Sequence, residues 1–487
     1  MIPPNRALHV PDAFCVGQAW QREHLFAYLL SVLPEHERDV AEHGNGLPAA
    51  QTQADRPGQG GFAPSQAPET LFEFPMRGIF PTTSAQELSG RDVRYDLFHS
   101  FQSWTKSGGD MSRPFRILFD AHTFDAGWQG TTTYLAGVLN ALPEAMERQA
   151  PGQKVEIFCA AAAAEPISQS VTTPYTFIPI RTGFIARNAV DIPRVAAEVG
   201  ADLVVSQYVR PFRSSCPTLS VIHDVLFLDY PDNFSWTFRK IRELVFGWSA
   251  RHSTMVATVS RYSAERIEAH FGIPSESILL TPNSVDPAFA SAERPRNSTG
   301  QRPLRLLSVS RLERRKRHEW GIRAVERLKQ AGIAAEYLII GGGEGPYADR
   351  LEAEVASARE AGLSVDLKGG VSFRDLVAAY SRADLFLCPS ESEGFGIPVI
   401  EAAAAGTPCV VSDGGALAEF DGLFEGESFP AENEEAFLSA VERVAADIEI
   451  CLDQAATRRH EIADRYQWSN VADVYATAVL ELGHSAA

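Results

Sequence analysis

Two carboxylates, Glu393 and Glu401, stand on either side of a glycine turn and a helix start in the stretch ESEGFGIPVIEAAAAGTP. Gly394 and Gly396 permit backbone conformations and close approaches that other residues cannot adopt. A helix N-terminus attracts anions, phosphate above all, whereas a carboxylate on each side would repel them. We therefore expect the carboxylates to accept hydrogen bonds from hydroxyls. This indicates a nucleotide sugar, which has phosphate in the middle and hydroxyls at both ends. The alternative is that Glu393 caps the helix and Glu401 is solvated.

Cations for a diphosphate are available in the run SVSRLERRKRHEW, which follows a predicted strand. Arg311 offers a planar fork and Lys316 a mobile point charge where that strand opens into its loop. The neighbouring Arg314, Arg315 and Arg317 leave open the alternative that the whole run is a solvated basic face.

A glycine-rich turn, LIIGGGEGPY, follows another predicted strand and contains Gly343 and Gly345. It allows either the approach of a ligand or simply a tight turn. Pro346 occupies the place of the third glycine in G-x-G-x-x-G, and the sequence has no G-x-x-x-x-G-K-[ST]. The usual dinucleotide and ATP sites are therefore disfavoured.

The first half of the chain offers two further candidates. His223 and Asp224 stand at the end of an apolar strand in IHDVLFLDYP, where the histidine could donate a hydrogen bond or shuttle a proton and the aspartate could orient it. Gly130 and Thr131 lie in a loop before a helix, where N–H groups and hydroxyls could meet phosphate or an acceptor. A structural His-Asp pair and N-capping by threonine are the alternatives.

Short β-rich runs alternate with helical segments from RPFRILFDAH onward, and this pattern predicts two doubly wound α/β domains. We expect the first over residues 111–295, the second over 296–465, and a C-terminal helix over 466–487 that returns to the first domain. Ligands of such sheets bind beyond the carboxyl ends of the strands, so a shared cleft is the expected site. Residues 1–110 are rich in Pro, Gly, Gln and Ala and are predicted to be largely disordered, with a translation start at Met111 as a hypothesis.

The composition of the chain limits the classes of partner and the location that we expect for the protein. The 487 residues carry a formal charge of −18, which argues against broad nucleic-acid binding. Six cysteines without a C-x-x-C pair suggest neither a disulfide framework nor a zinc site. The sequence shows no apolar run of transmembrane length and no secretion signal, so we expect a cytoplasmic protein. The segment NFSWTFRKIRELVFGW could lie on the inner face of the plasma membrane as a peripheral contact. Alternatively, it could form a helix with one buried apolar face and a charged face opposite to it.

Together these residues resemble family 4 glycosyltransferases, retaining enzymes of the GT-B fold, over roughly Phe115 to Leu482. The resemblance implies that the domain over residues 111–295 binds the acceptor and that the domain over 296–465 binds the nucleotide sugar. The stretch PSESEGFGIPVIEAAAAGTPCVVS reproduces the Pro-Ser, the Glu-Gly-Phe-Gly turn and the second glutamate eight residues after the first. Three positions depart from the family, because Ser310, Arg317 and Ser284 stand where it has glycine.

By this resemblance Glu393 would hold hydroxyls of the donor sugar, Glu401 would bind the ribose, and the cations would stabilise the leaving diphosphate without a metal or other cofactor. The predicted catalytic residues are His223, Arg311, Lys316 and Glu393. The predicted donor-binding residues are Gly343, Gly345, Gly394, Phe395, Gly396 and Glu401. The residues predicted to contact phosphate or the acceptor are Gly130, Thr131 and Asp224.

The resemblance extends to bacterial mannosyltransferases that build O-antigen or exopolysaccharide, which implies GDP-mannose as donor and a glycan or polyprenyl-linked glycan as acceptor. UDP-glucose or UDP-galactose is the alternative donor. A noncatalytic GT-B scaffold that binds nucleotide sugar within a polysaccharide assembly complex is the alternative function.

Overall fold

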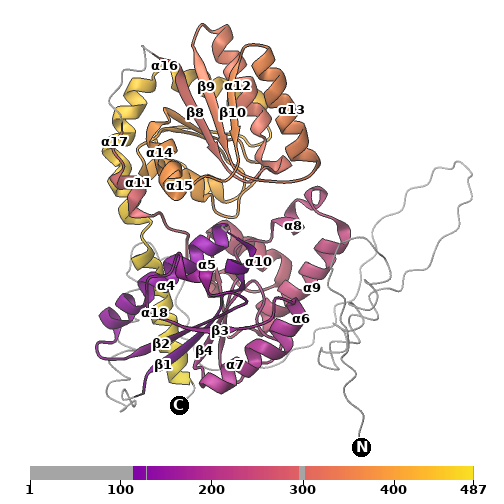
Figure 1. Ribbon diagram of the computed structural model, residues 1–487, viewed down its shortest axis with the longest axis vertical. Helices are drawn as coiled ribbons and strands as arrows, with labels where there is room; N and C mark the ends of the chain where they lie inside the picture. The colour runs from indigo at the N-terminus through magenta and orange to yellow at the C-terminus, as the bar shows by residue number, and fades with distance from the viewer. Residues whose placement is uncertain (1–112, 128, 295–301, 486–487) are drawn as a thin grey trace, which may run out of the picture. The chain divides into compact units, whose positions relative to one another are not determined.

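The computed structural model describes residues 113–127, 129–294 and 302–485 (Figure 1). The predicted disordered segment 1–110 and the hypothetical start at Met111 lie outside the described residues, as does most of the predicted linker around residue 298. The described chain forms two parallel sheets, each covered by helices, so the predicted α/β fold with two Rossmann-like domains is confirmed.

The first sheet has seven parallel strands in the order β3-β2-β1-β4-β5-β6-β7. Its strands are β1 Phe115–Asp120, β2 Val155–Ala161, β3 Thr176–Pro179, β4 Leu203–Gln207, β5 Thr218–Val221, β6 Met255–Thr258 and β7 Leu279–Leu280. The helices and helical turns of this part are η1 His122–Ala126, α4 Gly130–Gln149, α5 Glu165–Ser168, α6 Phe184–Ala186, η2 Arg187–Asp191, α7 Ile192–Val199, α8 Leu226–Asp229, η3 Pro231–Asn233, α9 Trp236–His252, α10 Arg261–Phe271, η4 Ser275–Ser277 and α11 Pro287–Ser291.

The second sheet has six parallel strands in the order β10-β9-β8-β11-β12-β13. Its strands are β8 Leu304–Val309, β9 Ala335–Ile340, β10 Ser364–Lys368, β11 Leu385–Cys388, β12 Cys409–Ser412 and β13 Gly426–Phe429. The helices and helical turns are η6 Arg314–Lys316, α12 His318–Gln330, α13 Pro346–Glu360, α14 Phe373–Arg382, α15 Ile397–Ala404, η7 Ala416–Phe420, α16 Glu434–Ala446, α17 Ile448–Arg465 and α18 Trp468–Ser485. Figure 1 shows α12 and α13 on one side of β8 to β10, with α14 and α15 on the other.

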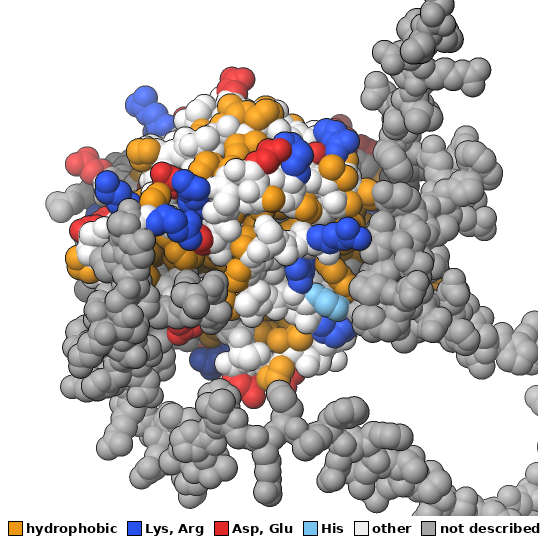
Figure 2. All heavy atoms as spheres, turned by 90° about the horizontal axis from the view of Figure 1, so that it is seen from below, with side chains coloured by type: hydrophobic (Ala, Val, Ile, Leu, Met, Phe, Trp, Pro, Cys, Tyr) orange, Lys and Arg blue, Asp and Glu red, His pale blue; other side chains and the backbone are white. Residues whose placement is uncertain are grey.

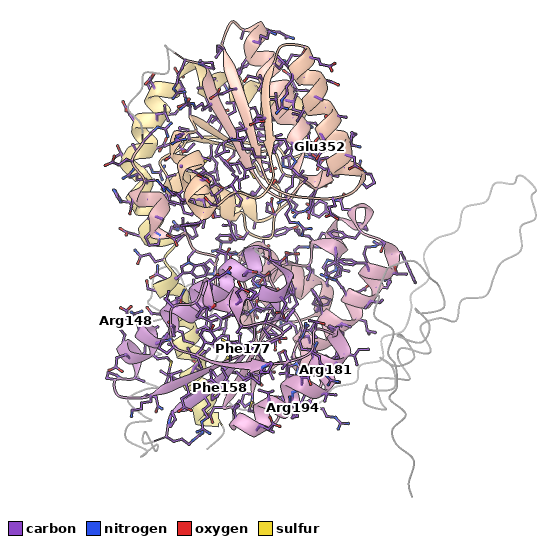
Figure 3. All side chains as sticks on the ribbon, viewed as in Figure 1. Arg148, Phe158, Phe177, Arg181, Arg194 and Glu352 are labelled. Carbon is purple, nitrogen blue, oxygen red and sulfur yellow. The ribbon has the colours of Figure 1, made fainter. Side chains whose placement is uncertain are left out.

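The strands are apolar on both faces because helices cover both faces, as is usual for parallel sheets. Phe158 and Phe177, labelled in Figure 3, illustrate this for neighbouring strands β2 and β3. Phe158 packs against the cluster around Leu118 and Val204, whereas Phe177 packs against the large cluster that includes Ile117. A sheet that is buried in this way holds its carboxyl edge rigidly, and that edge carries the candidate site residues.

The last helix, α18, packs along α4 of the first domain. The hydroxyls of Tyr134 in α4 and Tyr475 in α18 lie 2.9 Å apart, and the Tyr134 hydroxyl also donates to Thr281 Oγ1 at 2.8 Å. A side chain on Gly137 would collide with Trp468, since an added Cβ would lie 2.1 Å from its ring. The C-terminal helix therefore contributes to the core of the first domain.

The aromatic and basic segment expected on a bilayer or in the core forms α9 and the turn before it. Its C-terminal half carries the buried Val245, Phe246 and Trp248, as the buried-face alternative requires, whereas Trp236 at its start is 64% exposed. On the face shown in Figure 2, basic, acidic and hydrophobic side chains are interspersed. Among the described residues, no helix combines the length and the apolar character needed to cross a bilayer.

Candidate active site

The loops that follow β8 and β11 meet where the second sheet reverses its strand order. β8 leads into the turn η6 with Lys316, and β11 leads into the turn before α15 with Glu393. The backbone N–H of Glu391 in the second loop donates to the carbonyl of Arg315 in the first at 2.7 Å. Ligands of doubly wound sheets bind at such switch points, so these two loops form the candidate site.

Glu393 lies at the centre of this site with its side chain 13% exposed. Its Oε1 accepts hydrogen bonds from Lys316 Nζ and from Ser390 Oγ, and its Oε2 accepts one from Arg315 Nη1 at 3.2 Å. Burial raises the pKa of Glu393, but the charges of Lys316 and Arg315 outweigh burial and lower it to about 2. The carboxylate is therefore ionised at neutral pH and can only accept hydrogen bonds, as the binding of hydroxyls requires.

Of the two predicted cations, the structure brings Lys316 but not Arg311 to Glu393. The Arg311 side chain is 71% exposed, and its Nε lies 3.3 Å from Glu313 Oε1. Arg315 is the arginine that reaches the site, since its Nη1 also donates to the Ser392 carbonyl at 2.9 Å. Arg315 could not be singled out from the sequence, because a run of basic residues does not show which side chains a tight turn directs inward.

Glu401 sits in α15 and is partly buried rather than solvated. Its Oε2 accepts a hydrogen bond from the Tyr380 hydroxyl at 2.8 Å. Burial raises the pKa of Glu401 to about 7, against the opposing effect of the Tyr380 hydrogen bond. Glu401 therefore changes its charge near neutral pH, unlike Glu393.

The turn ahead of α15 approaches the first domain closely at Gly394. A Cβ at Gly394 would lie 2.7 Å from the Cβ of Asp224, so no larger residue fits. The Gly394 carbonyl accepts hydrogen bonds from Ser260 Oγ at 2.7 Å and Ser263 Oγ at 3.1 Å. Gly394 is thus held by residues of the first domain, and its close contact with Asp224 joins two predicted site residues.

The next two residues of the turn have structural reasons for their identity. The Phe395 ring is 8% exposed and lies edge-on to Phe420 with ring centroids 5.4 Å apart, so only its backbone is available for a donor. Gly396 has φ +111°, a left-handed conformation that favours glycine, and a Cβ there would lie 2.6 Å from Leu417. The contacts of Phe395 with Phe420 and of Gly396 with Leu417 therefore fix the turn.

The two predicted glycines of the GGGEGP loop differ in their surroundings. A Cβ at Gly343 would lie 2.8 Å from the Leu312 carbonyl oxygen, which supports the tight-turn interpretation for this residue. Gly345 has φ +97° and stands in open space, directly before Pro346 at the start of α13. Gly345 therefore leaves room for a ligand near the N-terminus of α13.

His223 lies beyond the end of β5 and is 6% exposed. Its Nε2 is 2.7 Å from Gln207 Oε1, and the edge of the Tyr134 ring faces it with ring centroids 4.8 Å apart. Burial lowers the pKa of His223 to about 3, so the ring is neutral and suited to hydrogen bonding. Asp224 does not orient it, because Asp224 Oδ1 accepts from the Leu226 N–H at 3.2 Å and Gln207 holds the ring instead.

Gly130 begins α4, and a Cβ there would lie 3.3 Å from Ile397 Cδ1 at the start of α15. The first residues of the two helices therefore lie close together. The Oγ1 of Thr131 is buried and has no hydrogen-bond partner among the described residues. Threonine N-capping does not occur here, because the N-cap of α4 is Gln129 and its side chain makes no capping hydrogen bond.

Solved structures share this arrangement of two parallel-sheet domains. Sucrose-phosphate synthase from Thermosynechococcus elongatus superposes with a TM-score of 0.60 at 19% identity, over 77% of this chain and all of that one. HepE of Anabaena in complex with UDP-glucose gives a TM-score of 0.58 at 18% identity, over 75% of this chain and 99% of that one. The fold is therefore GT-B, the architecture expected from the sequence.

Two family models match the chain in succession. The model described as Glycosyltransferase Family 4 matches residues 128–289, and the model described as Glycosyl transferases group 1 matches residues 290–460. The chain belongs to the family 4 glycosyltransferases.

Curated relatives cover part of the chain. A GDP-mannose-dependent alpha-(1-6)-phosphatidylinositol monomannoside mannosyltransferase of Mycolicibacterium smegmatis is 28% identical over 249 residues, which is 48% of this chain and 64% of the relative. A glycogen synthase of Mycobacterium tuberculosis is 31% identical over 269 residues, which is 54% of this chain and 63% of the relative. The match thus spans slightly less than two thirds of the length of each of these relatives.

Proposed function

We propose that the protein is a retaining glycosyltransferase that moves a hexose from a nucleotide sugar to a glycan or polyprenyl-linked glycan in surface polysaccharide synthesis. The observation that carries this proposal is the ionised Glu393, held by Lys316 and Arg315 at the switch point of the second sheet. A buried carboxylate beside two cations matches a donor whose hydroxyls and diphosphate lie next to each other.

In the proposed reaction, Glu393 accepts hydrogen bonds from the donor sugar and Glu401 accepts them from the ribose. Lys316, Arg315 and the N-terminus of α15 stabilise the negative charge that develops on the leaving diphosphate. The acceptor hydroxyl attacks through an oxocarbenium-like state, on the face from which the diphosphate leaves, and this preserves the configuration. We propose no role for a metal ion or other cofactor, because these cations can balance the charge of the diphosphate.

GDP-mannose is the donor that we propose first. The support is the likeness to mycobacterial proteins named as GDP-mannose-dependent mannosyltransferases, one of which is 35% identical over 169 residues. The glycogen synthases among the relatives favour the second candidate, a UDP-glucose or UDP-galactose donor. A measurement of which nucleotide sugar binds will separate the two candidates.

The test combines binding and turnover. Saturation-transfer NMR with GDP-mannose, UDP-glucose and UDP-galactose identifies the donor, and release of GDP or UDP reports its turnover. We expect Lys316→Ala and Arg315→Ala each to lower turnover about 100-fold, by analogy with the loss of one transition-state donor. Arg314→Ala, an exposed arginine of the same turn, is the matched control and should keep turnover.

Two outcomes would decide against parts of this proposal. Binding of a donor without any turnover would favour the noncatalytic scaffold. A loss of turnover in Arg311→Ala, with Arg315→Ala unaffected, would show that the arginine predicted from the family resemblance is the one that acts.

For the location we propose the cytoplasm, with peripheral attachment to the inner face of the plasma membrane. The exposed Trp236, beside Arg239 and Lys240 at the start of α9, supports this contact. Co-sedimentation with anionic vesicles should fall in Trp236→Ser. Equal co-sedimentation of this variant and the unmodified protein would contradict the membrane contact through Trp236.

A further inference from the structure

The segment from Ser310 to His318, here called the cation loop, carries both cations of the candidate site. It leads from the end of β8 to the first residue of α12, and its turn η6 contains the two side chains that contact Glu393. Ser310 and Arg317, near the two ends of this loop, occupy positions at which the family has glycine. The proposed function gives neither residue a role, so their side-chain contacts need an explanation.

A hydrogen bond between side chains joins the two ends of the cation loop. Ser310 Oγ lies 2.8 Å from Nε2 of His318, which is 1% exposed. Nδ1 of His318 lies 3.2 Å from the hydroxyl of Tyr347, which donates its proton to Glu319 Oε2 at 2.7 Å. The Tyr347 oxygen can therefore only accept from the ring, so Nδ1 carries the hydrogen of the neutral imidazole. Nε2 then accepts from the Ser310 hydroxyl.

A serine bonded to a histidine is also the arrangement of a nucleophile and its base. In this pair the histidine is a weak base, because burial and the nearby charge of Lys316 lower the pKa of His318 to about 3. The ring therefore does not take the serine proton at neutral pH. The pair is a fixed hydrogen bond, which holds the two ends of the cation loop together.

Arg317 makes a second connection at the far end of the loop. Its φ is +50°, a left-handed conformation that residues other than glycine rarely adopt. Its Nη1 donates to the carbonyl of Ala431 beyond β13, and its Nη2 lies 3.2 Å from Glu432 Oε2. Its guanidinium carbon lies 4.8 Å from the centroid of the Trp320 ring. Glycine would adopt this backbone without strain but would make none of these contacts.

The two connections bear on how the cations meet a diphosphate. The side chains of Lys316 and Arg315 are 9% and 18% exposed, so the loop directs both into the site. Groups that are already aimed at a developing charge stabilise it without reorganisation at the moment of reaction. A loop that is ordered before the ligand arrives also avoids the entropy cost of ordering on binding.

We propose that Ser310, His318 and Arg317 are positioning residues, which hold the cation loop in the geometry for the leaving diphosphate before the nucleotide sugar binds. They act through Lys316 and Arg315 rather than by touching the substrate. This inference rests on the proposed function, in which those two cations stabilise the diphosphate. It also implies that the glycines of the family are harmful in this chain, although glycine relieves the backbone strain at position 317.

The test restores glycine at each position, in Ser310→Gly and in Arg317→Gly. Calorimetric titration with GDP and with UDP measures the affinity for a free diphosphate, which carries the charge that develops on the leaving group. Each variant should lose affinity for the nucleotide that the unmodified protein binds by about tenfold, and kcat should fall by a similar factor, because the cations are no longer held in place. KM for the donor should change less, since the diphosphate of the donor carries less charge.

A conservative variant and a matched control make the result specific. Ser310→Thr keeps the hydroxyl and should keep most of the affinity and of kcat. Ser428 Oγ donates to Asp421 Oδ1 at 3.2 Å on the exposed edge strand β13, so Ser428→Gly removes a comparable bond outside the site and should change neither quantity. Unchanged affinity and kcat in both Ser310→Gly and Arg317→Gly would overturn the proposal. Equal losses in Ser310→Gly and Ser310→Thr, or in Ser310→Gly and Ser428→Gly, would also overturn it.

The ring of His318 gives a readout that needs no nucleotide. The ¹⁵N chemical shifts of the unmodified protein should show a hydrogen on Nδ1, and the Nε2 resonance should move to higher chemical shift in Ser310→Gly, where it loses its donor. A hydrogen on Nε2 in the unmodified protein would overturn the proposal. The absence of both GDP and UDP binding by the unmodified protein would instead contradict the proposed function, so the two failures are distinguishable.

Discussion

The two glutamates of the candidate site have opposite electrostatic surroundings. Glu393 faces Lys316 and Arg315, which lower its pKa to about 2 against the effect of burial. For Glu401, burial and the charge of Asp286 outweigh the hydrogen bond from Tyr380 and raise its pKa to about 7. One carboxylate is therefore permanently charged, and the other acquires its charge close to neutral pH. In the proposed function both accept hydrogen bonds from hydroxyls, so only Glu401 should make donor binding depend on pH.

The raised pKa of Glu401 makes the stability of the folded protein depend on pH, because protonation and folding are linked. Between about pH 4.5 and pH 7 the folded chain keeps a proton on Glu401 that the unfolded chain has released, so the free protein loses stability as the pH rises through this range. Glu401→Gln should remove this loss and raise the unfolding free energy at pH 8 by on the order of 2 kcal/mol. Thermal unfolding at pH 8 measures the gain, and the same variant at pH 4.5 should show little of it.

Nucleotide binding should respond in the opposite sense. In the proposed function the ribose hydroxyls donate to the ionised form of Glu401, so the affinity for the nucleotide should increase as the pH rises from 6 to 8. Calorimetric titration at the two pH values checks this expectation. Glu401→Gln should bind nucleotide weakly at both, and an equal pH dependence in variant and unmodified protein would assign the effect to another group.

At the scale of the elements, the glycine turn before α15 combines two requirements. Gly396 needs a left-handed backbone and also lies against Leu417, whereas Gly422 has φ +72° but no atom near the position of a Cβ. We expect Gly422→Ala to cost on the order of 1 kcal/mol of stability through backbone strain alone. Gly396→Ala should cost more and also weaken donor binding, because the turn that carries Glu393 must shift.

Urea unfolding and donor titration of both variants test this difference. Equal stability losses in the two variants would show that the contact with Leu417 is easily relieved. Unchanged donor affinity in Gly396→Ala would show that the turn does not control the position of Glu393.

The sequence predicted the strands better than the side-chain directions. The apolar runs RILFDA, ADLVVSQ and ADLFLCPS coincide with β1, β4 and β11 to within a few residues, because a doubly covered strand must be apolar on both faces. The edge strand β13, with the polar sequence GESF, gave no such signal. Arg315 could not be assigned, since its contact with Glu393 depends on which way a short helical turn points the side chain, and local sequence does not specify this.

At the scale of the whole molecule, the chain returns through α18 to support the first domain at the residues next to His223. Tyr134 of α4 makes an edge contact with the His223 ring and bonds through its hydroxyl to Tyr475 of α18. Trp468, at the start of α18, lies with its ring centroid 6.0 Å from that of Tyr134. The final helix is therefore part of the support of the site as well as part of the core.

This arrangement predicts that changes in α18 act on the site in proportion to how far they displace α4. Trp468→Ala leaves a cavity against Gly137 and should lower the unfolding free energy by about 3 kcal/mol. Tyr475→Phe removes one hydroxyl of a buried pair and should cost about 1 kcal/mol. If α18 supports His223 through Tyr134, turnover measured well below each melting temperature should fall in Trp468→Ala and fall less in Tyr475→Phe. Full turnover in a destabilised Trp468→Ala protein would mean that α18 stabilises the first domain without positioning His223.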